Sequence, residues 1–457
     1  MGARTLSAAH AHESGLAAAL VALLGCATVI MLAGIAMDDV PVTVAGGAAL
    51  GAVLVALVAA DWLSGLYVIA LSLPLPAVYD TGDLRIATAA PVTAAVLLGW
   101  VLQHGALARA PDVRRLPVLP SIALLAAFLL ATVLAPYPLV SVRELLNFLL
   151  LFAFLVLAAD RLASRPERVR GAVTMLVAVA ALSGVAALLE TLDILPGQFP
   201  RTETRWFRAA LGFGQPNALG LFLALSLPLA AHRLHVTRGA ARSLAAFSVL
   251  AIALGLFGTF SRGAWLSVLA GTAVLFFARS GRYALRIWVV AFFGALVLDI
   301  VSGGALRDTA ARTIDDWVID QRAALMLAGV LMFLDHPLTG VGPGGYAESL
   351  DRYGAQIPQL WDYLPTPHNA YVQMAAEAGI VGLLAFVAFL AAVLWRALRA
   401  ARRAAHGTNA EEASLRRALL WSVAVACCAG MVVWPFSHGT GQAAMFVFAA
   451  CLAAEHA

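Results

Sequence analysis

The chain has 457 residues, of which 62% are hydrophobic and 12% charged, and its formal net charge is +4. Soluble domains carry about a quarter charged residues, so this composition excludes an ordinary soluble protein and predicts an integral membrane protein. Every basic residue is an arginine, which excludes a P-loop lysine and a Schiff-base lysine, and we do not expect this chain alone to drive transport with ATP.

Membrane spans are predicted wherever an apolar run reaches roughly 17–25 residues. About fourteen runs meet this condition, and twelve are also allowed because the third run and the pair within 243–278 are the least distinct. The predicted fold class is an all-α polytopic membrane protein with about 12–14 transmembrane helices. In chain order the runs lie near 16–36, 43–60, 62–79, 86–104, 117–135, 141–159, 169–192, 211–231, 243–260, 262–278, 284–301, 368–395, 416–435 and 438–456.

Arginine content differs between alternate loops, and this asymmetry sets the predicted orientation. With fourteen spans, the arginine-rich loops all fall on one side, which we predict to be the cytoplasm, together with both termini. These loops contain residues 109–115, 161–170, 233–242, 279–286 and 396–417. The opposite, extracytoplasmic side receives the long segment 302–367.

The segment 302–367 is longer than an ordinary connection, and such long loops are usually functional or disordered. Its apolar pattern over 323–333 predicts a helix at the membrane interface, and "HPLTGVGPGGY" (336–346) ends that helix with prolines and glycines. We therefore divide the chain into four parts. They are the N-terminal spans (1–192), the central spans (193–301), this extracytoplasmic loop with its short helices (302–367) and the C-terminal spans (368–457).

The four cysteines lie inside apolar runs and show no metal-ligand spacing. They are Cys26, Cys427, Cys428 and Cys451. We therefore expect no disulfide, no metal site and no cofactor, and we expect no nucleic-acid partner.

About ten arginines map to the extracytoplasmic side, where the positive-inside rule disfavours them. Three have distinctive contexts: Arg208 precedes a glycine-rich turn, Arg262 occupies a tight Ser-Arg-Gly break between two apolar runs, and Arg322 begins the loop helix. Arg262 is also consistent with an arginine that simply extends to the membrane interface. Because a guanidinium binds phosphate oxygens in bidentate fashion, the three together predict a diphosphate held at the membrane surface.

Polar residues open the last long apolar run, in "LPTPHNAYVQMAAEAG" (364–379). We predict Thr366 as the N-cap and Pro367 as the first helical residue, which places His368 in the first turn. The helix dipole disfavours a positive charge there, so His368 should be neutral near pH 7 and able to act as a general base. A histidine that only hydrogen-bonds a neighbouring loop is the alternative.

Asn369, Gln373 and Glu377 follow at i, i+4 and i+8 and so line one face of that helix. Glu377 lies about two turns deep, where a carboxylate is either functional or part of a buried network. The glycines of "TGVGPGGY", including Gly342 and Gly344, allow close backbone approach. They are suited to a phosphate-binding nest, or simply to a tight turn back to the membrane.

Four of these stretches, in this order, resemble the O-antigen ligase / O-antigen polymerase superfamily of bacterial inner-membrane glycosyltransferases. They are "RAALGFGQPNALGLFLALSLPLA", "TFSRGAWLSVLAG", "QRAALMLAGVLMFLDHPLTGVGPGGY" and "PHNAYVQMAAEAGIVGLLAFVAFL". The resemblance covers about 205–390, and "DHPLTGVGPGGY" followed by "HNAY…EAG" is its most specific part. It departs mildly at Gln215, where the family more often has an asparagine.

The resemblance implies transfer of a glycan from undecaprenyl diphosphate to an acceptor hydroxyl at the periplasmic face, without a metal or ATP. The implied catalytic residues are His368, which would activate the acceptor, and Arg208 and Arg322, which would bind the lipid diphosphate. The predicted substrate-binding residues are Arg262, Asn217, Gly342, Gly344, Asn369 and Glu377, with the role of Glu377 left open. The implied partners are the lipid-linked donor, a lipid A–core or growing glycan acceptor, and membrane lipids.

Ligation to lipid A–core is the favoured variant, but the shared motifs do not separate it from polymerisation of repeat units or transfer to protein. A transporter or lipid flippase is an alternative from another class, and fourteen spans would suit it. Such carriers keep ionisable residues at mid-membrane sites and show internal repeats. Glu190 and Glu377 are the main candidates for such sites here, and the sequence shows no clear repeat.

Overall fold

The computed structural model describes most of the chain, and the structural statements below concern the described residues alone. These are 40–74, 79–80, 85–86, 89–107, 111–164, 166–197, 207–278, 281–301, 316–354, 357, 366–407, 409–431 and 438–455. The predicted span at 16–36 and Cys26 lie outside them.

Helices make up nearly all of the described residues. The first half contains α2 (Val40–Ala60), α3 (Trp62–Ser72), α4 (Ala89–Leu107), the 3₁₀ helix η1 (Val113–Arg115), α5 (Val118–Val133), α6 (Pro138–Ser164) and α7 (Pro166–Thr191). The second half contains η2 (Leu211–Phe213), α8 (Pro216–Val236), α9 (Gly239–Gly258), α10 (Arg262–Gly271), α11 (Ala273–Phe277), α12 (Gly281–Val301), α14 (Asp316–Asp335), α15 (Gly345–Gly354), α16 (Ala370–Ala404), α17 (Ala410–Ala429) and α18 (His438–Glu455). Two short strands, β1 (Tyr79–Asp80) and β2 (Arg85–Ile86), pair antiparallel.

These elements confirm the predicted class, an all-α polytopic membrane protein. Each predicted run from 43–60 onward contains a described helix. Within the described ranges, 5 helices are long and apolar enough to cross a membrane, namely α6, α7, α8, α9 and α16. Shorter apolar helices lie within α2, α4, α5, α10–α11 and α18. The total of 12–14 spans and the four-part division stay predictions.

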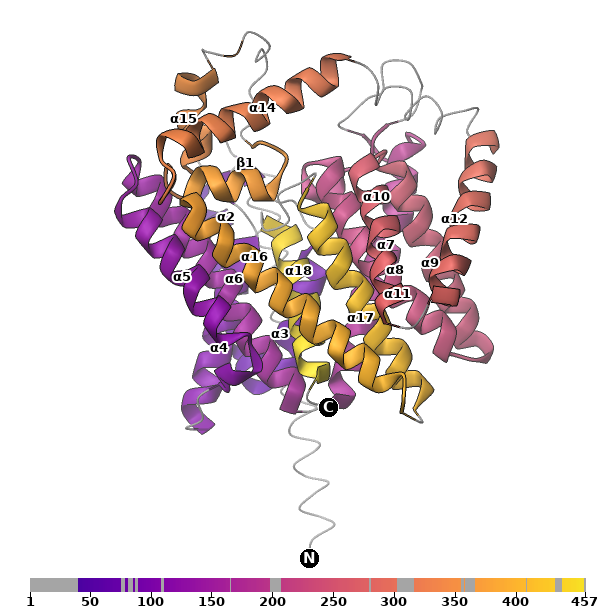
Figure 1. Ribbon diagram of the computed structural model, residues 1–457. Coiled ribbons are helices and arrows are strands. Elements are labelled where there is room, and N and C mark those ends of the chain that lie inside the picture. Colours follow the sequence, from indigo (N-terminus) through magenta and orange to yellow (C-terminus); the bar gives the residue numbers. More distant parts are fainter. Residues whose placement is uncertain are drawn as a thin grey trace, which may run out of the picture.

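The last helix, α18, forms the centre of the molecule. All of residues 441–454 are buried, and α18 packs against α6, α8, α16 and α17 (Figure 1). Outer helices instead expose large apolar side chains, such as Leu119 on α5 at 78% and Val290 on α12 at 71%. An apolar outer surface around a packed interior is what a lipid environment requires.

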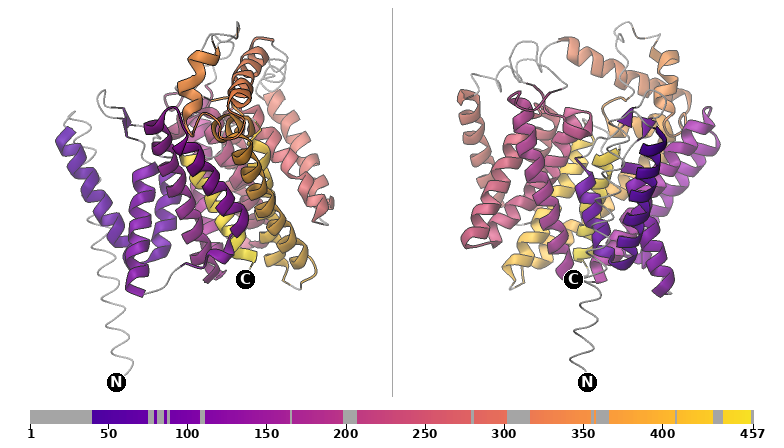
Figure 2. Two further views of the ribbon diagram at one scale, coloured as in Figure 1. Left: turned by 60° about the vertical axis from the view of Figure 1, so that its left-hand side comes forward. Right: turned by 180° about the vertical axis from the view of Figure 1, so that it is seen from behind.

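Helices α14 and α15 lie across one end of the bundle (Figures 1 and 2). The loop helix predicted over 323–333 is confirmed within α14. This helix packs against α15 and α16, and Leu325, Met332 and Tyr346 belong to their shared apolar core. The 302–367 segment therefore contributes a small packed unit that sits over the start of α16.

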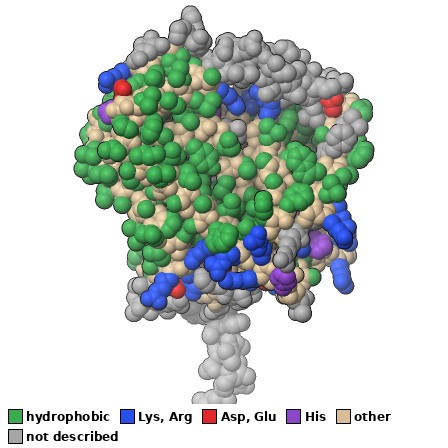
Figure 3. Space-filling view, in the orientation of Figure 1, with side chains coloured by type: hydrophobic (Ala, Val, Ile, Leu, Met, Phe, Trp, Pro, Cys, Tyr) green, Lys and Arg blue, Asp and Glu red, His purple; other side chains and the backbone are tan. Residues whose placement is uncertain are grey.

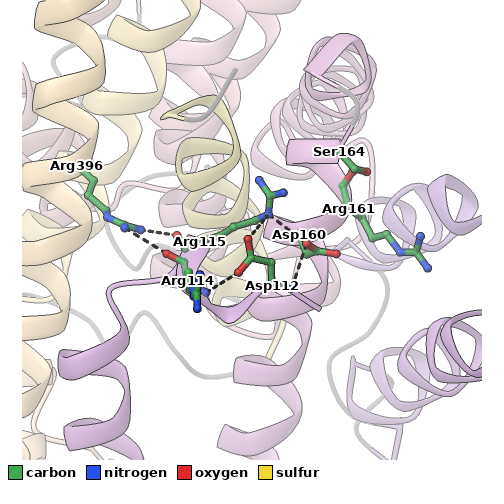
Figure 4. Close-up of polar contacts among 7 residues, drawn as sticks. All are labelled: Asp112, Arg114, Arg115, Asp160, Arg161, Ser164 and Arg396. Atoms are coloured by element: carbon green, nitrogen blue, oxygen red, sulfur yellow. Dashed lines mark hydrogen bonds and ion pairs between the residues drawn. The ribbon is translucent and has the colours of Figure 1, made fainter. Parts of the chain in front are cut away.

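Basic side chains gather at the opposite end of the bundle, and a smaller basic group lies just below the upper loops (Figure 3). At the opposite end, Asp160 is 1% exposed and accepts hydrogen bonds from the Asp112 amide at 3.2 Å and from Arg115 Nε at 3.1 Å (Figure 4). Arg396 of α16 donates to the Arg115 carbonyl and pairs with Glu455 of α18 at 3.3 Å. This cluster, which we call the basal clamp, joins η1, α6, α16 and α18.

Candidate functional site

The helix that carries the polar motif begins later than predicted. Asn369 is the N-cap of α16, and its Oδ1 accepts from the amides of residues 371 and 372 at 3.0 and 3.1 Å. The predicted cap at Thr366 is wrong, because residues 366–368 are not helical and the asparagine oxygen already satisfies the first free amides. His368 therefore lies just before the helix rather than in its first turn.

His368 has a left-handed backbone, with φ of +52°, which is strained for a non-glycine residue. Burial and the nearby positive charge of Arg322 lower the pKa of His368 from 6.5 to about 4. The imidazole is therefore neutral at pH 7, in the predicted direction. The cause differs from the predicted one, since burial and a neighbouring cation replace the helix dipole.

Arg262 and Arg322 lie close enough for their charges to interact. Burial and the positive charge of Arg262 lower the pKa of Arg322, and Arg322 acts in turn on His368. The three residues come from the start of α10, from α14 and from the segment before α16. Because like charges in a half-buried site repel one another, this cluster is electrostatically suited to an anion.

Arg208 and Asn217 are tied to the turn that precedes Arg262. Arg208 Nε donates to the Thr259 carbonyl at 3.3 Å, and Asn217 Oδ1 accepts from the Ser261 hydroxyl at 2.9 Å. Ser261 is also the N-cap of α10. The segments 208–217 and 259–262 are therefore joined to each other, and Arg262 of this unit acts on Arg322 through its charge.

Left-handed backbone recurs in the segments that carry these residues. Among the described non-glycine residues, φ is positive at Asp193, at Leu211 (46°), at Phe260 (48°) and at His368 (52°). Leu211 is three residues from Arg208, and Phe260 is two residues from Arg262. Such conformations cost about 1–3 kcal/mol each and cluster at functional sites.

The span predicted over 368–395 lies in α16, which is long and apolar enough to cross a membrane. The sequence pattern did not predict that this helix is broken at one point. Its backbone leaves the helical region at Gly379, with φ +63° and ψ −164°, and the helix then continues to Ala404. The turn after α14 fills the break, and the amides of Val341 and Gly342 donate to the carbonyls of residues 376 and 377 at 2.8 and 3.0 Å. Broken helices persist in membranes where protein satisfies the freed backbone groups. A Cβ at Gly379 would overlap the backbone of Leu338, so the break requires glycine.

Glu377 holds the same turn through its side chain. The residue is 7% exposed. Its carboxylate accepts from the amides of Gly344 and Tyr346 and from Gln373 Nε2 at 3.2 Å. Gln373 and Glu377 thus interact along the predicted helix face, and Asn369 on that face caps the helix.

The amides of residues 340–346 all have protein acceptors, apart from Pro343, which has no N–H. Gly342 and Gly344 approach protein closely, because Cβ atoms there would meet Ala135 and Glu144 respectively. These contacts favour the tight-turn interpretation, in which the turn's amides are occupied by the Glu377 side chain and by backbone carbonyls. Phosphate binding by the two glycines stays a prediction.

Glu190 has a similar arrangement near Arg208, although the sequence indicated it only as a candidate for the carrier alternative and not as a residue of the transferase site. It is 3% exposed, and its Oε2 accepts from the amides of Ala210 and Leu211 at 3.1 and 2.9 Å. In the sequence, Glu190 appears only as an acidic residue near the end of an apolar run. That pattern does not indicate which groups the carboxylate contacts.

The tertiary structure brings together most of the predicted site residues. The charge of Arg262 acts on Arg322, and the charge of Arg322 acts on His368. Arg208 is tied to the turn before Arg262. We call these four residues the cationic site. Asn369 caps α16, and Asn217 braces the start of α10. Gly342 and Gly344 belong instead to the turn after α14, and Glu377 of α16 holds that turn. Among the described residues, no three His, Cys, Asp or Glu side chains are grouped as a metal site would need.

A family model described as O-antigen ligase matches residues 247–387. The match begins within α9 and ends within α16, so it includes Arg262, Arg322 and His368 but stops short of Arg208. No curated protein matches the chain. The resemblance inferred from the motifs is confirmed over the matched segment.

Proposed function

We propose, because residues 247–387 belong to the O-antigen ligase family, that this membrane protein transfers a glycan from undecaprenyl diphosphate to an acceptor hydroxyl. The family match supports a glycosyltransferase-type enzyme with a lipid-linked glycan and an acceptor as partners. The observation that carries the proposal is the cationic site. It combines arginines suited to a diphosphate with a histidine that is neutral at pH 7 and suited to accept a proton.

In the proposed reaction, the acceptor hydroxyl oxygen attacks the anomeric carbon of the donor sugar. A C–O bond forms there as the bond from that carbon to the diphosphate oxygen breaks. His368 takes the hydroxyl proton and later releases it to solvent. Arg322 and Arg208, with Arg262, stabilise the charge that develops on the departing undecaprenyl diphosphate. The donor's own diphosphate bond drives the transfer, so neither ATP nor a metal takes part.

The proposed reaction takes place at the periplasmic face of the bacterial inner membrane, beneath α14 and α15. The arginine-rich opposite end would then face the cytoplasm, as the positive-inside rule favours. The preferred acceptor is lipid A–core, and a growing glycan is the alternative. A proton-coupled carrier is less well supported, because the carboxylates of Glu190 and Glu377 already accept backbone amides.

The test uses purified protein in liposomes with a glycan-loaded undecaprenyl diphosphate donor and no ATP. We expect release of undecaprenyl diphosphate only when acceptor is present. The amount released should equal the amount of acceptor that gains a glycan. Lipid A–core and a lipid-linked repeat unit are supplied separately, so the acceptor that supports release separates ligation from polymerisation. Donor that crosses the bilayer without diphosphate release would instead identify a carrier.

His368→Ala is the first variant for this assay. General-base catalysis contributes roughly 10²–10⁴-fold, so we expect a loss of that size in kcat with little change in donor binding. The matched control is His336→Ala, since His336 is an exposed imidazole in the same loop unit. Turnover near the wild-type rate in His368→Ala would refute the base assignment.

A further inference from the structure

We infer that Glu190 and Glu377 are positioning residues, each of which fixes the backbone segment that places one arginine of the cationic site. Glu190 would place Arg208, and Glu377 would place Arg322. The inference rests on the proposed function only for what the arginines bind, because the hydrogen bonds themselves are features of the fold.

The first arrangement is short and direct. Both amides held by Glu190 lie within three residues of Arg208, and both donate to the same oxygen, Oε2. The Phe207 and Ala209 amides, on either side of Arg208, donate to the carbonyls of Thr191 and Gly258 at 3.2 and 3.0 Å. The backbone around Arg208 is therefore held by four hydrogen bonds. Two are accepted by the carbonyls of Thr191 and Gly258, and two by the Glu190 carboxylate.

The second arrangement passes through one buried tyrosine. Glu377 accepts the Tyr346 amide, and the Tyr346 hydroxyl donates to the Leu325 carbonyl of α14 at 2.6 Å. Tyr346 is fully buried, and Leu325 lies one helical turn from Arg322. A continuous path of hydrogen bonds thus connects the Glu377 carboxylate to the part of α14 that carries Arg322.

Both carboxyl groups are buried and accept hydrogen bonds from backbone amides. The low local dielectric of a buried site strengthens such hydrogen bonds, and an amide left without its acceptor there is costly. A displacement of about 1 Å at a reacting centre can reduce the rate about 100-fold. Loss of either carboxylate should therefore reduce kcat by about that factor while the arginine itself remains in the chain.

The two carboxylates differ in a way that makes the inference testable. One glutamine oxygen can replace Oε2 of Glu190, because both amides share that atom. At Glu377 three donors converge, from Gly344, Tyr346 and Gln373, and a glutamine offers one oxygen plus a competing NH₂ group. We expect the kcat of Glu190→Gln to stay within about 3-fold of the wild-type value. The kcat of Glu377→Gln should instead fall by nearly as much as that of the alanine variant, about 100-fold.

Hydrogen–deuterium exchange of the full chain in detergent, without substrate, tests the structural step. Glu190→Ala should speed exchange over 207–213 and leave 340–346 near wild type, whereas Glu377→Ala should do the reverse. Glu190→Gln should restore protection over 207–213. Unchanged exchange in the affected segment, or equal loss in both segments, would overturn the inference.

Kinetics and binding then test the functional step. With farnesyl diphosphate as the binding probe, both alanine variants should bind more weakly than wild type. Glu348→Gln is the matched control, because Glu348 is an exposed glutamate on α15. If wild type releases no undecaprenyl diphosphate, the proposed function fails while the exchange result still stands. If wild type is active and both alanine variants match its kcat and its probe affinity, the positioning roles fail instead.

Discussion

His368 is the residue whose chemistry can be tested most directly by pH. Its pKa is lowered to about 4, so the neutral form that accepts a proton is present above that value and is lost as the pH falls through it. We expect kcat/KM to be flat from about pH 5.5 to 8 and to fall below about pH 5. The measurement is the pH profile of undecaprenyl diphosphate release. An acid limb centred near 6.5 would contradict the lowered pKa.

Arg322 allows charge and geometry to be separated at the same site. Arg322→Lys keeps the positive charge beside His368 but loses the planar fork, so transfer should fall at least 10-fold while the acid limb stays near pH 4. Burial is the larger cause of the lowered His368 pKa, and Arg322→Gln removes the second cause, the neighbouring charge. Its residual activity should therefore show an acid limb at higher pH than that of Arg322→Lys. Identical pH limbs in the two variants would show that Arg322 does not act on His368.

At the scale of elements, the broken α16 and the turn after α14 form one unit. Gly340 has φ +68°, and a Cβ there would overlap the backbone of Glu377. Gly340→Ala should therefore separate the turn from α16, lower the thermal midpoint in detergent and reduce transfer at least 10-fold.

Gly239→Ala is the matched control for that change. Gly239 has φ +58°, but a Cβ there would meet nothing within 4 Å. Both alanines bear the left-handed backbone cost of about 1–2 kcal/mol, and Gly340→Ala alone adds a clash. Equal losses of stability and activity in the two variants would show that strain, rather than docking of the turn, is responsible.

At the scale of the whole molecule, the basal clamp and the cationic site lie at opposite ends of α16. Asp160 is almost fully buried and accepts from an amide and a guanidinium. Asp160→Asn removes the closer carboxylate of Arg115 and leaves only that of Asp112 at 3.9 Å, so the free energy of unfolding should fall by about 1–3 kcal/mol. The measurement is denaturation in detergent. Transfer per folded molecule should change less than about 3-fold, since the clamp is remote from the site.

Local sequence patterns predicted the helices, the end of the loop helix and several candidate site residues. Apolar run lengths located the helices, because backbone groups in lipid must be satisfied within each helix. The alternation of prolines and glycines in 336–346 correctly ended the loop helix. Arg262, Arg322 and His368 stood out because polar groups at span boundaries are costly without a partner, and the structure gathers them into one site.

The tertiary structure decided what those residues contact. Asn369 displaced Thr366 as the N-cap, and Gly379 broke α16, because a turn from elsewhere in the chain satisfies the freed backbone groups. The partners of Glu377 lie some thirty residues earlier, and those of Glu190 some twenty residues later. The sequence by itself therefore determined the membrane class and most candidate residues. Packing alone determined which carboxylates hold the loops, because hydrogen bonds between distant segments leave no periodic signal along the chain.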